Sequence, residues 1–412
     1  MQPMLKTFRR HRLMPTLVVL QIALATAILC NALSLLQQRL APLLVHDGVA
    51  ANQVILISHI YNTTGKGWSG AQIQTGYAEL RAIPGVIAVS AGSPLPMVSG
   101  WYNSDAIFSS NGKHKADAAI YVGNNLVNAL GLKLVAGRNF SPSELVDATM
   151  QNEGGLNTNA PVIITHAIAQ RLFPGTNPLG QQVRVGSKHS SYHTVVGVVG
   201  HLLRNDFNSA NQSAAGNVLL IPGRFIDFPA IEYAVRTDPN VLPAVLKSIP
   251  FALRRVFPPN DATAHSRPRI ETFEAARAAF FHGRRAAVWL LSSVTLVVLI
   301  VTLIGIMGLT GFWVQQRTRQ IGVRRALGAR RVDILRYFQT ENLLLATAGI
   351  ALGCAAAIGI NVWLMAHYAV PRLPIVYLPI GAVALWLLGQ LAVLGPALRA
   401  ARVPPTTAMR AA

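Results

Sequence analysis

Four long apolar runs dominate the hydropathy pattern of the chain. They cover residues 14–36, 286–312, 343–366 and 375–398, and none of them contains a charged residue. A helix needs about 20 apolar residues to cross the hydrocarbon core of a bilayer, so each run is long enough to span a membrane. The pattern therefore predicts four transmembrane helices, one before and three after a long middle segment.

The first apolar run could be a membrane helix or part of a signal peptide. Lys6, Arg9, Arg10 and Arg12 precede it, and a basic segment before an apolar run also begins a secretory signal peptide. The apolar cores of signal peptides are about 7–15 residues long. This run has 23 residues and no clean cleavage site after it. We therefore expect residues 14–36 to be a transmembrane helix that is not cleaved.

The middle of the chain, residues 37–285, has the pattern of a folded domain. Short apolar runs typical of strands alternate with amphipathic stretches and with Gly or Pro turns. This alternation predicts an α+β domain of two lobes, large enough to fold around its own core. The expected strands cover residues 53–58, 86–91, 118–122, 182–185, 192–200 and 231–237, the expected helices cover 70–83, 126–130 and 241–256, and 161–172 is expected to be a strand that runs into a helix.

Composition also indicates a membrane protein. The 412 residues are 51% hydrophobic and only 13% charged, with a mean hydropathy of +0.38, whereas soluble proteins average about 25% charged residues. The net charge of +20 does not indicate a nucleic-acid binder, because residues 39–283 carry 19 basic and 14 acidic residues, a surplus of only 5. The 2 cysteines, Cys30 and Cys354, lie in apolar runs, which excludes a disulfide scaffold and a cysteine-based metal site.

The remaining positive charge lies next to the apolar runs and predicts the orientation in the membrane. The N-terminal tail, the loop between the second and third runs and the C-terminal tail carry 4, 7 and 3 Lys or Arg. The other side carries only Arg284, Arg285 and Arg372. Positive residues are enriched in cytoplasmic loops. We therefore expect cytoplasmic tails at 1–13 and 399–412, a cytoplasmic loop at 313–342, an extracytoplasmic domain at 37–285 and a short external loop at 367–374.

The chain lacks the short motifs of common catalytic and nucleotide-binding sites. No G-x-x-x-x-G-K-[ST], H-E-x-x-H or G-x-S-x-G occurs. His189 and His193 are close in sequence, but no acid or third ligand stands at a suitable spacing, so we expect exposed loop histidines. The apolar runs hold no ionisable Asp, Glu, Lys, Arg or His, which argues against a proton- or ion-driven transporter. We expect no catalytic residue, metal or cofactor on this chain, and any energy for work must come from a partner.

The loop at 313–342 carries the most information about function. Ile321, Arg324 and Gly328 follow one another at helical intervals, and after the break at Gly328 a second helix is expected from about Arg331. A short helix on the membrane surface, sharply joined to a membrane helix, is suited to being moved by a cytoplasmic partner. From these residues alone, a helix that only lies among lipid headgroups remains an alternative.

Two further features concern the packing of the membrane helices. Gly349 and Gly353 form a G-x-x-x-G motif, which is typical of close helix packing within or between subunits. Four amide side chains within the runs are expected either to bridge helices by hydrogen bonds or to lie near the headgroups: Gln21, Asn31, Asn361 and Gln390.

Motifs along nearly the whole chain resemble the MacB/FtsX family of ABC transporter permeases. The sequence R-x-R-x-I-G-V-R-R-A-L-G-A from Arg317, followed by D-I-L and a glutamate at the start of an apolar helix, is similar to the permease signature of the family. The closing segment 396–405 is similar to the family's C-terminal tail. Four segments resemble the external domain of MacB-like proteins: IPGV at 83–86, AGRNF at 136–140, AQRLFPG at 169–175 and NPLGQ at 177–181.

The resemblance implies a type VII ABC permease, with one helix before and three after a large extracytoplasmic domain. That domain would have a Porter-like lobe, from parts before about Val122 and after about Gly216, and an inserted Sabre-like lobe between them. Binding of ATP and Mg²⁺ by an ABC ATPase would close a permease dimer, and a coupling helix at 318–329 would transmit this motion to the external lobes, a process called mechanotransmission. The implied ATPase-coupling residues are Gln320, Ile321, Gly322, Arg324, Arg325, Ala326, Leu327, Gly328, Ala329 and Asp333.

The resemblance also implies partners and two alternative functions. MacB itself carries its ATPase on the same chain, whereas this sequence has about 13 residues before its first helix, so a separate ATPase subunit is expected. The other expected partners are a second permease copy or a paralogue, and a membrane-fusion adaptor with an outer-membrane channel, at the bacterial inner membrane. The expected function is export of a peptide, antibiotic or lipid-linked cargo. The alternative is a regulatory mechanotransmitter that controls an extracytoplasmic enzyme such as a cell-wall hydrolase, and a weaker one is an anchored binding protein without an ATPase.

Overall fold

The computed structural model describes residues 13–62, 67–98, 103–150, 152–156, 158–186, 190–206, 212–258, 268–318, 321, 323, 327–368 and 372–402. The chain forms two compact units. The membrane unit comprises Met1–Ala41 and Arg284–Ala412, and the globular unit comprises Pro42–Gly283. The apolar runs thus lie in one unit and the expected α+β domain in the other.

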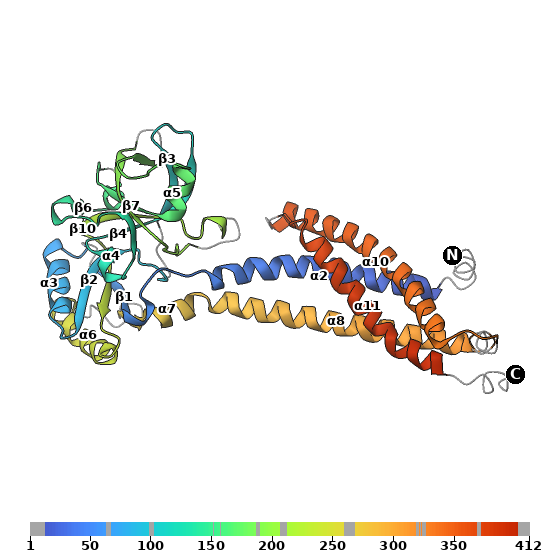
Figure 1. Ribbon diagram of the computed structural model, residues 1–412. Coiled ribbons are helices and arrows are strands. Elements are labelled where there is room, and N and C mark those ends of the chain that lie inside the picture. The colour runs from blue at the N-terminus through green and yellow to red at the C-terminus, as the bar shows by residue number, and fades with distance from the viewer. Residues whose placement is uncertain are drawn as a thin grey trace. The chain divides into compact units, whose positions relative to one another are not determined.

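The membrane unit is built on four long helices: α2 (Leu13–Leu44), α8 (His282–Gln316), α10 (Arg331–Tyr368) and α11 (Tyr377–Arg402) (Figure 1). Each contains a segment that is long and apolar enough to cross a membrane. The expected four transmembrane helices, one before and three after the middle segment, are therefore confirmed. The helix α10 begins at Arg331, before its apolar run, and α11 continues through Pro396 to Arg402.

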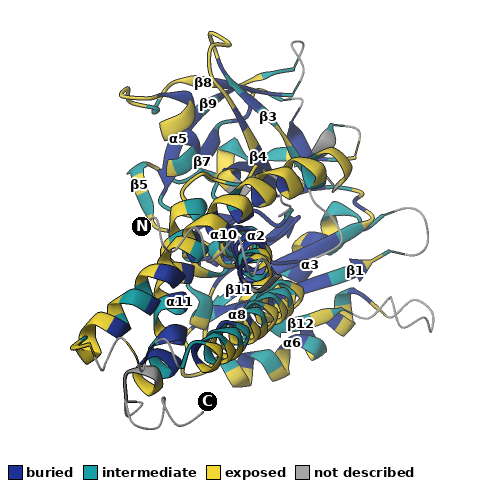
Figure 2. Ribbon diagram, turned by 90° about the vertical axis from the view of Figure 1, so that its right-hand side faces the viewer, coloured by how far each residue is buried: buried dark blue, intermediate teal, exposed yellow. Residues whose placement is uncertain are grey.

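One apolar cluster joins these four helices. It contains Ile22 from α2, Ile306 from α8, Phe338 from α10 and Val393 from α11, all of them buried. Many other large apolar side chains of the same helices are exposed, and these faces are yellow in the burial view (Figure 2). Lipid can cover such a surface at no hydrophobic cost, as expected for membrane helices.

Amide side chains connect the helices by hydrogen bonds to backbone carbonyls. Gln21 on α2 donates to the Val301 carbonyl of α8 at 3.3 Å, and Asn31 donates to the Ala357 carbonyl of α10 at 3.2 Å. Gln390 on α11 donates to the backbone of α10, and Asn361 accepts from the backbone of the segment before α11. Of the two roles open from the sequence, the structure therefore shows helix bridging for three of the four amides.

The globular unit is a twelve-stranded mixed sheet. Its strands lie in the order β12-β1-β11-β2-β4-β3-β8-β9-β7-β10-β6, with β5 paired to β9 and a further pairing of β4 with β10. Most neighbouring strands in this order are antiparallel, but β6–β10 and β7–β9 are parallel. The additional pairing of β4 with β10 is also parallel. The strands are β1 (Val54–Tyr61), β2 (Val86–Ser93), β3 (Ser104–Ser109), β4 (Lys115–Gly123), β5 (Leu134–Gly137), β6 (Val146–Ala148), β7 (Val162–Thr165), β8 (Gln182–Val185), β9 (Tyr192–Val199), β10 (Val218–Phe225), β11 (Ala230–Thr237) and β12 (Arg269–Thr272).

Helices cover both faces of this sheet. On one face, α3 (Gly70–Arg81) and α6 (Leu242–Val256) pack in a cluster with Ile55 of β1. On the other, α4 (Leu126–Ala129) and α7 (Phe273–Phe280) pack in a cluster with Leu56 of the same strand. Because both faces are buried, the first four residues of β1, VILI at 54–57, form a continuous apolar run rather than an alternating one.

The two lobes share strands, so the boundary between them differs from the expectation. The inserted lobe was expected to begin at about Val122, yet β3 already pairs with β8, with Ile107 opposite Val185. The helix α5 (His166–Leu172) lies in the same lobe as β3 (Figure 1). Residues of both lobes, from Ile55 to Val195, belong to a single apolar cluster, so the lobes are continuous.

His193 is buried, contrary to the expectation of an exposed loop histidine. It lies on β9, where the period of two places its side chain on the same buried face as Val195. Its Nδ1 lies 3.0 Å from the Ala160 carbonyl oxygen. Burial lowers the pKa of His193, because removal from water disfavours the imidazolium. His189 lies outside the described residues.

The buried ionisable side chains of the globular unit include Glu232 and Arg204. Glu232 on β11 is 7% exposed and accepts a hydrogen bond from the Leu95 backbone N–H at 2.7 Å. Burial raises the pKa of Glu232 to about 8. Arg204 is fully buried and donates to Asp117 at 2.7 Å and to Asp206 at 2.6 Å. The Arg204–Asp117 pair connects the segment after β9 to β4.

Candidate coupling site

The described residues of the loop between α8 and α10 take part in two helical turns. The Ile321 N–H donates to the Arg317 carbonyl at 2.9 Å, and the Leu327 N–H donates to the Val323 carbonyl at 3.0 Å. Both bonds have the four-residue spacing of an α-helix. Five of the ten predicted coupling residues lie outside the described residues: Gln320, Gly322, Arg324, Arg325 and Ala326.

The loop ends at a glycine, and α10 starts three residues later. Gly328 has a φ of +98°, a backbone conformation that other residues rarely adopt. Asp333, in the first turn of α10, accepts a hydrogen bond from the Arg330 backbone N–H at 3.0 Å. This bond satisfies one of the free N–H groups at a helix start, where a negative charge is also favoured. The restart expected at about Arg331 is confirmed, and Asp333 fixes where it occurs.

Two of the five described residues that were predicted for coupling differ in their exposure. Ile321 is buried, and it belongs to the apolar cluster that also contains Ile334 and Phe338 of α10. Leu327 is 83% exposed. The loop is thus anchored to α10 through Ile321 and presents Leu327, beside Gly328 and Ala329, to its surroundings.

A buried ion pair joins the first residue of this loop to α10. The Arg317 Nη1 lies 3.2 and 3.3 Å from the two carboxylate oxygens of Glu341, and it also contacts the Tyr337 hydroxyl at 3.4 Å. The guanidinium lies over the Trp313 ring, 4.5 Å from its centroid. The side chains of Arg317 and Glu341 are only 13% and 3% exposed. We call this pair the clamp, because it fixes the start of the loop to the helix that follows the loop.

Sequence analysis did not single out the clamp as a site. Arg317 was one of seven arginines in the loop, and Glu341 was noted only as an acid at the start of an apolar helix. The available signal was that Glu341 and Asp333 are the only acids outside residues 39–283. An acid next to an apolar run in a strongly basic flank requires a cationic partner.

The two glycines of the G-x-x-x-G motif lie against α2 of the same chain. A Cβ on Gly349 would lie 2.8 Å from the Ile22 Cβ, and one on Gly353 would lie 2.4 Å from the Thr26 Cβ. Neither position has room for a methyl group without a shift of the helices. Within the chain, these glycines allow α2 and α10 to approach closely.

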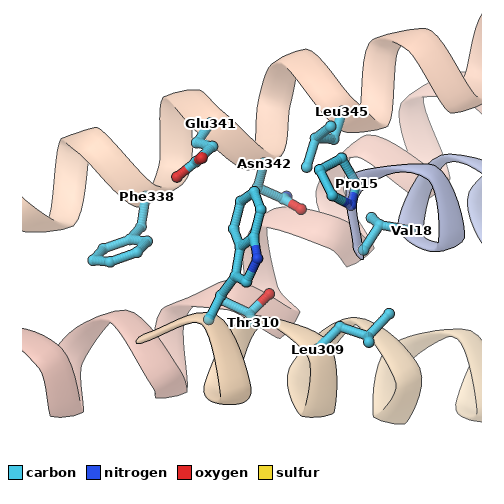
Figure 3. Close-up of a pocket in the computed structure, with 9 residues that line it drawn as sticks. Pro15, Val18, Leu309, Thr310, Phe338, Glu341, Asn342 and Leu345 are labelled. Carbon is cyan, nitrogen blue, oxygen red and sulfur yellow. The ribbon is translucent and has the colours of Figure 1, made fainter. Parts of the chain in front are cut away.

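A pocket lies next to the clamp, between α2, α8 and α10 (Figure 3). The pocket is small and partly open to the surroundings. Its lining is mostly apolar, with the polar groups of Thr310, Glu341 and Asn342. Among the described residues, no group of three or more His, Cys, Asp or Glu is placed to hold a metal ion.

The described part of this region combines helical turns, a glycine break, a buried clamp and close-packed membrane helices. Residues 22–250, more than half of the chain, match the family described as MacB-like periplasmic core domain, and residues 292–405 match the FtsX-like permease C-terminal family. The chain belongs to the MacB/FtsX-like ABC transporter permeases. The globular unit is therefore the MacB-like extracytoplasmic domain of this permease, and residues 313–342 lie within its FtsX-like part.

Individual relatives agree with this assignment. The macrolide export ATP-binding/permease protein MacB of Agrobacterium fabrum is 32% identical over 251 residues, which are 58% of this chain and 35% of the relative. The uncharacterized ABC transporter permease YknZ of Bacillus subtilis is 25% identical over 334 residues, 80% of this chain and 77% of the relative. The chain spans about a third of the length of the MacB-type relative.

One solved structure is similar to the extracytoplasmic part. The crystal structure of the periplasmic region of MacB from Actinobacillus actinomycetemcomitans covers 56% of this chain and 94% of its own, with 16% identity and a TM-score of 0.35.

Proposed function

We propose that this permease couples ATP binding and hydrolysis on a separate ABC ATPase subunit to movement of its extracytoplasmic domain. In this mechanism two permease copies, or a copy and a paralogue, pair in the bacterial inner membrane. Each ATPase docks on residues 318–329, and the dimer closes when ATP and Mg²⁺ bind. The predicted cytoplasmic tails and loop carry 14 basic residues against 3 on the other side, which supports this orientation.

The observation that carries the proposal is the connection of the loop to the membrane helices. Ile321 is packed against α10, and the Arg317–Glu341 clamp joins α8 to α10 next to it. A partner that displaces the loop therefore moves α10 as well, since the loop cannot shift without breaking a buried ion pair. A helix that only rested among lipid headgroups would need neither contact.

Export is the favoured outcome of this movement. Several relatives are named as export proteins, for a macrolide, for syringafactin or for pyoverdine. We propose a peptide, antibiotic or lipid-linked cargo, handed on through a membrane-fusion adaptor to an outer-membrane channel. Because the extracytoplasmic domain would do the moving, the cargo need not cross the bilayer through this chain.

Co-purification from solubilised membranes tests the ATPase partnership. The wild-type chain should retain an ABC ATPase, whereas the double variant Arg324→Glu, Arg325→Glu should lose it. A matched control reverses a different pair of adjacent arginines, the exposed Arg254 and Arg255 on α6 of the globular unit, and should retain the ATPase. Absence of an ATPase from the wild-type preparation under all nucleotide conditions would contradict the proposal.

Deletion of the chain from its own bacterium separates export from regulation. Export predicts that a secreted product or efflux capacity is lost while cell-wall remodelling is unchanged. The reverse pattern would establish the regulatory alternative, in which the same movement controls an extracytoplasmic enzyme.

A further inference from the structure

The globular unit is joined to the membrane unit by two covalent connections. It comprises Pro42–Gly283, so the chain enters it near the end of α2 and leaves it in the first turn of α8. Residues 42–53 run from α2 to β1, and α7 connects β12 to α8. The strands β1 and β12 pair with each other, with Ile55 opposite Thr272. A movement that is passed along the chain from either membrane helix therefore arrives at the same edge of the sheet.

One side chain of the globular unit joins these two connections to each other. Arg277, in the last turn of α7, donates from Nη2 to the Leu43 carbonyl at 3.2 Å and to the Val45 carbonyl at 3.4 Å. Its Nε lies 2.9 Å from the Asp47 Oδ2. The guanidinium also lies over the ring of Phe281, directly before α8, at 5.3 Å from the ring centroid. We call the Arg277–Asp47 pair the latch, because it fixes the segment that enters the domain to the segment that leaves it.

The latch is largely withdrawn from solvent. The Asp47 side chain is 9% exposed and that of Arg277 is 23% exposed. Phe281, which is fully buried, and the half-buried Leu43 belong to one apolar cluster around the pair. The other carboxylate oxygen of Asp47 accepts a hydrogen bond from the Val49 backbone N–H at 3.3 Å. Separating a buried charge from its partner is strongly unfavourable, so the two connections resist any shift that breaks the pair.

Arg277 also caps the end of α2. The last turn of α2 contains no basic residue of its own. The Leu43 carbonyl is one of the last four of this helix, which lack a partner within the helix and carry a partial negative charge. Arg277 supplies both a donor and a positive charge from a different helix. The C-terminus of the first membrane helix is thus held by the element that leads into the second.

We propose that Arg277 is a positioning residue of the coupling mechanism, because the latch makes the two connections move as one body. A shift of α2 or of α8 then reaches β1 and β12 together and moves the extracytoplasmic domain as a whole. Without the latch, one connection can move while the other stays, and the movement is taken up between them instead of reaching the sheet. This inference rests on the proposed function, since it concerns how the movement enters the extracytoplasmic domain.

The distance between the two connections tests the latch without any ATPase. The exposed His46 and His282 are replaced by Cys in a full-length permease without its two native cysteines, and the distance between spin labels at these positions is measured by pulsed electron paramagnetic resonance in nanodiscs. The intact latch should give one narrow distance distribution. Arg277→Met, and Asp47→Asn, which keeps the shape of the side chain but removes its charge, should widen the distribution. An unchanged width in both variants would overturn the proposal.

The complex with the ATPase tests whether the latch positions the moving domain. When ATP and Mg²⁺ bind, the distance between positions 46 and 282 should stay constant with the intact latch, and a change of this distance would overturn the proposal without recourse to any variant. Movement of the domain is followed by energy transfer between fluorophores at Lys113→Cys, in the turn between β3 and β4, on the two copies. In Arg277→Met this movement should be lost although ATP hydrolysis continues, and Arg277→Lys, which keeps the charge beside Asp47, should retain most of it.

The matched control makes the same substitution in an exposed ion pair of the globular unit. Arg224→Met removes the partner of Asp147 at 2.6 Å, but the side chains of this pair are 48% and 52% exposed, so the distance distribution and the movement should stay as in the wild type. Full movement in Arg277→Met, as a purely structural role predicts for any variant that folds, would overturn the proposal, and so would equal loss of movement in Arg224→Met. If the wild type shows no movement on ATP binding, the proposed function fails, whereas the latch still stands or falls with the width measured without nucleotide.

Discussion

Removal of one partner of the Arg317–Glu341 clamp should strongly destabilise the membrane unit. The two side chains are 13% and 3% exposed, so each charge has lost most of its water and depends on the other. Breaking a buried ion pair from one side costs about 3–5 kcal/mol, because the remaining charge is left without a counterpart. We expect about 3 kcal/mol for Arg317→Met and a similar cost for Glu341→Gln, the lower end because Arg317 keeps some contact with solvent.

The double variant distinguishes an ion pair from two independent residues. With both charges removed, no buried charge remains unpaired, so the loss should be only about 0–1 kcal/mol, below that of either single variant and far below their sum of about 6 kcal/mol. The assay is unfolding of the full chain in mixed micelles by increasing SDS, followed by tryptophan fluorescence. The matched control is the exposed pair Arg224–Asp147, which is shorter at 2.6 Å but whose side chains are 48% and 52% exposed.

The control pair should contribute only about 0–1 kcal/mol, because exposed ion pairs are screened by water. Single and double clamp variants whose costs add within about 0.5 kcal/mol would refute the reasoning. So would clamp variants that are no more destabilising than Asp147→Asn.

Three further predictions concern other parts of the chain. Gly353→Leu should separate α2 from α10, because even a Cβ at this position would lie 2.4 Å from the Thr26 Cβ. Size-exclusion chromatography in detergent should then show less folded permease, and a normal elution profile would contradict this. The pKa of Glu232 is raised to about 8 in the folded protein. Between about pH 4.5 and 8 the native state therefore binds more protons than the unfolded state. The free energy of unfolding should fall by up to about 1.4 kcal/mol per pH unit as the pH rises through this window. Thermal unfolding at pH 5.5 and 8 should show this fall in the wild type and a smaller one in Glu232→Gln, and equal slopes would contradict the prediction. Arg204→Leu should destabilise the extracytoplasmic domain by about 3–5 kcal/mol, because it leaves Asp206 buried without its partner, and urea unfolding that shifts by less than 1 kcal/mol would exclude this.

Most of the architecture could be predicted because it follows from composition and periodicity. The membrane helices are set by apolar runs without charge, and the strands around Val54 and Val235 by β-branched residues between turns. The strands β3, β5, β6, β10 and β12 were missed. The mixed polar sequences of β3 and β12 acquire strand structure only by pairing with β8 and β1, and the apolar run of β10 is interrupted by Pro222 and Gly223. His193 was misplaced because its polarity was weighed more heavily than the period of the strand that contains it.

The candidate site could be predicted only in part. The helical spacing of the loop, its glycine break and the restart at Arg331 are local properties, and they can be read from the sequence. The clamp is not local, because Arg317 and Glu341 are 24 residues apart and meet only through the packing of α8 against α10.

The coupling claim is tested most directly by the movement of the extracytoplasmic domain during ATP turnover. Lys113, in the exposed turn between β3 and β4, is replaced by Cys and labelled with fluorophores in a permease whose Cys30 and Cys354 are changed to Ala. The complex with its ATPase is reconstituted in nanodiscs, and energy transfer between the two copies is followed. The account predicts a change of transfer when ATP and Mg²⁺ bind, reversal on hydrolysis, and loss of the change in Arg317→Met. An ATPase that binds and turns over while the transfer stays constant in the unmodified clamp would contradict it.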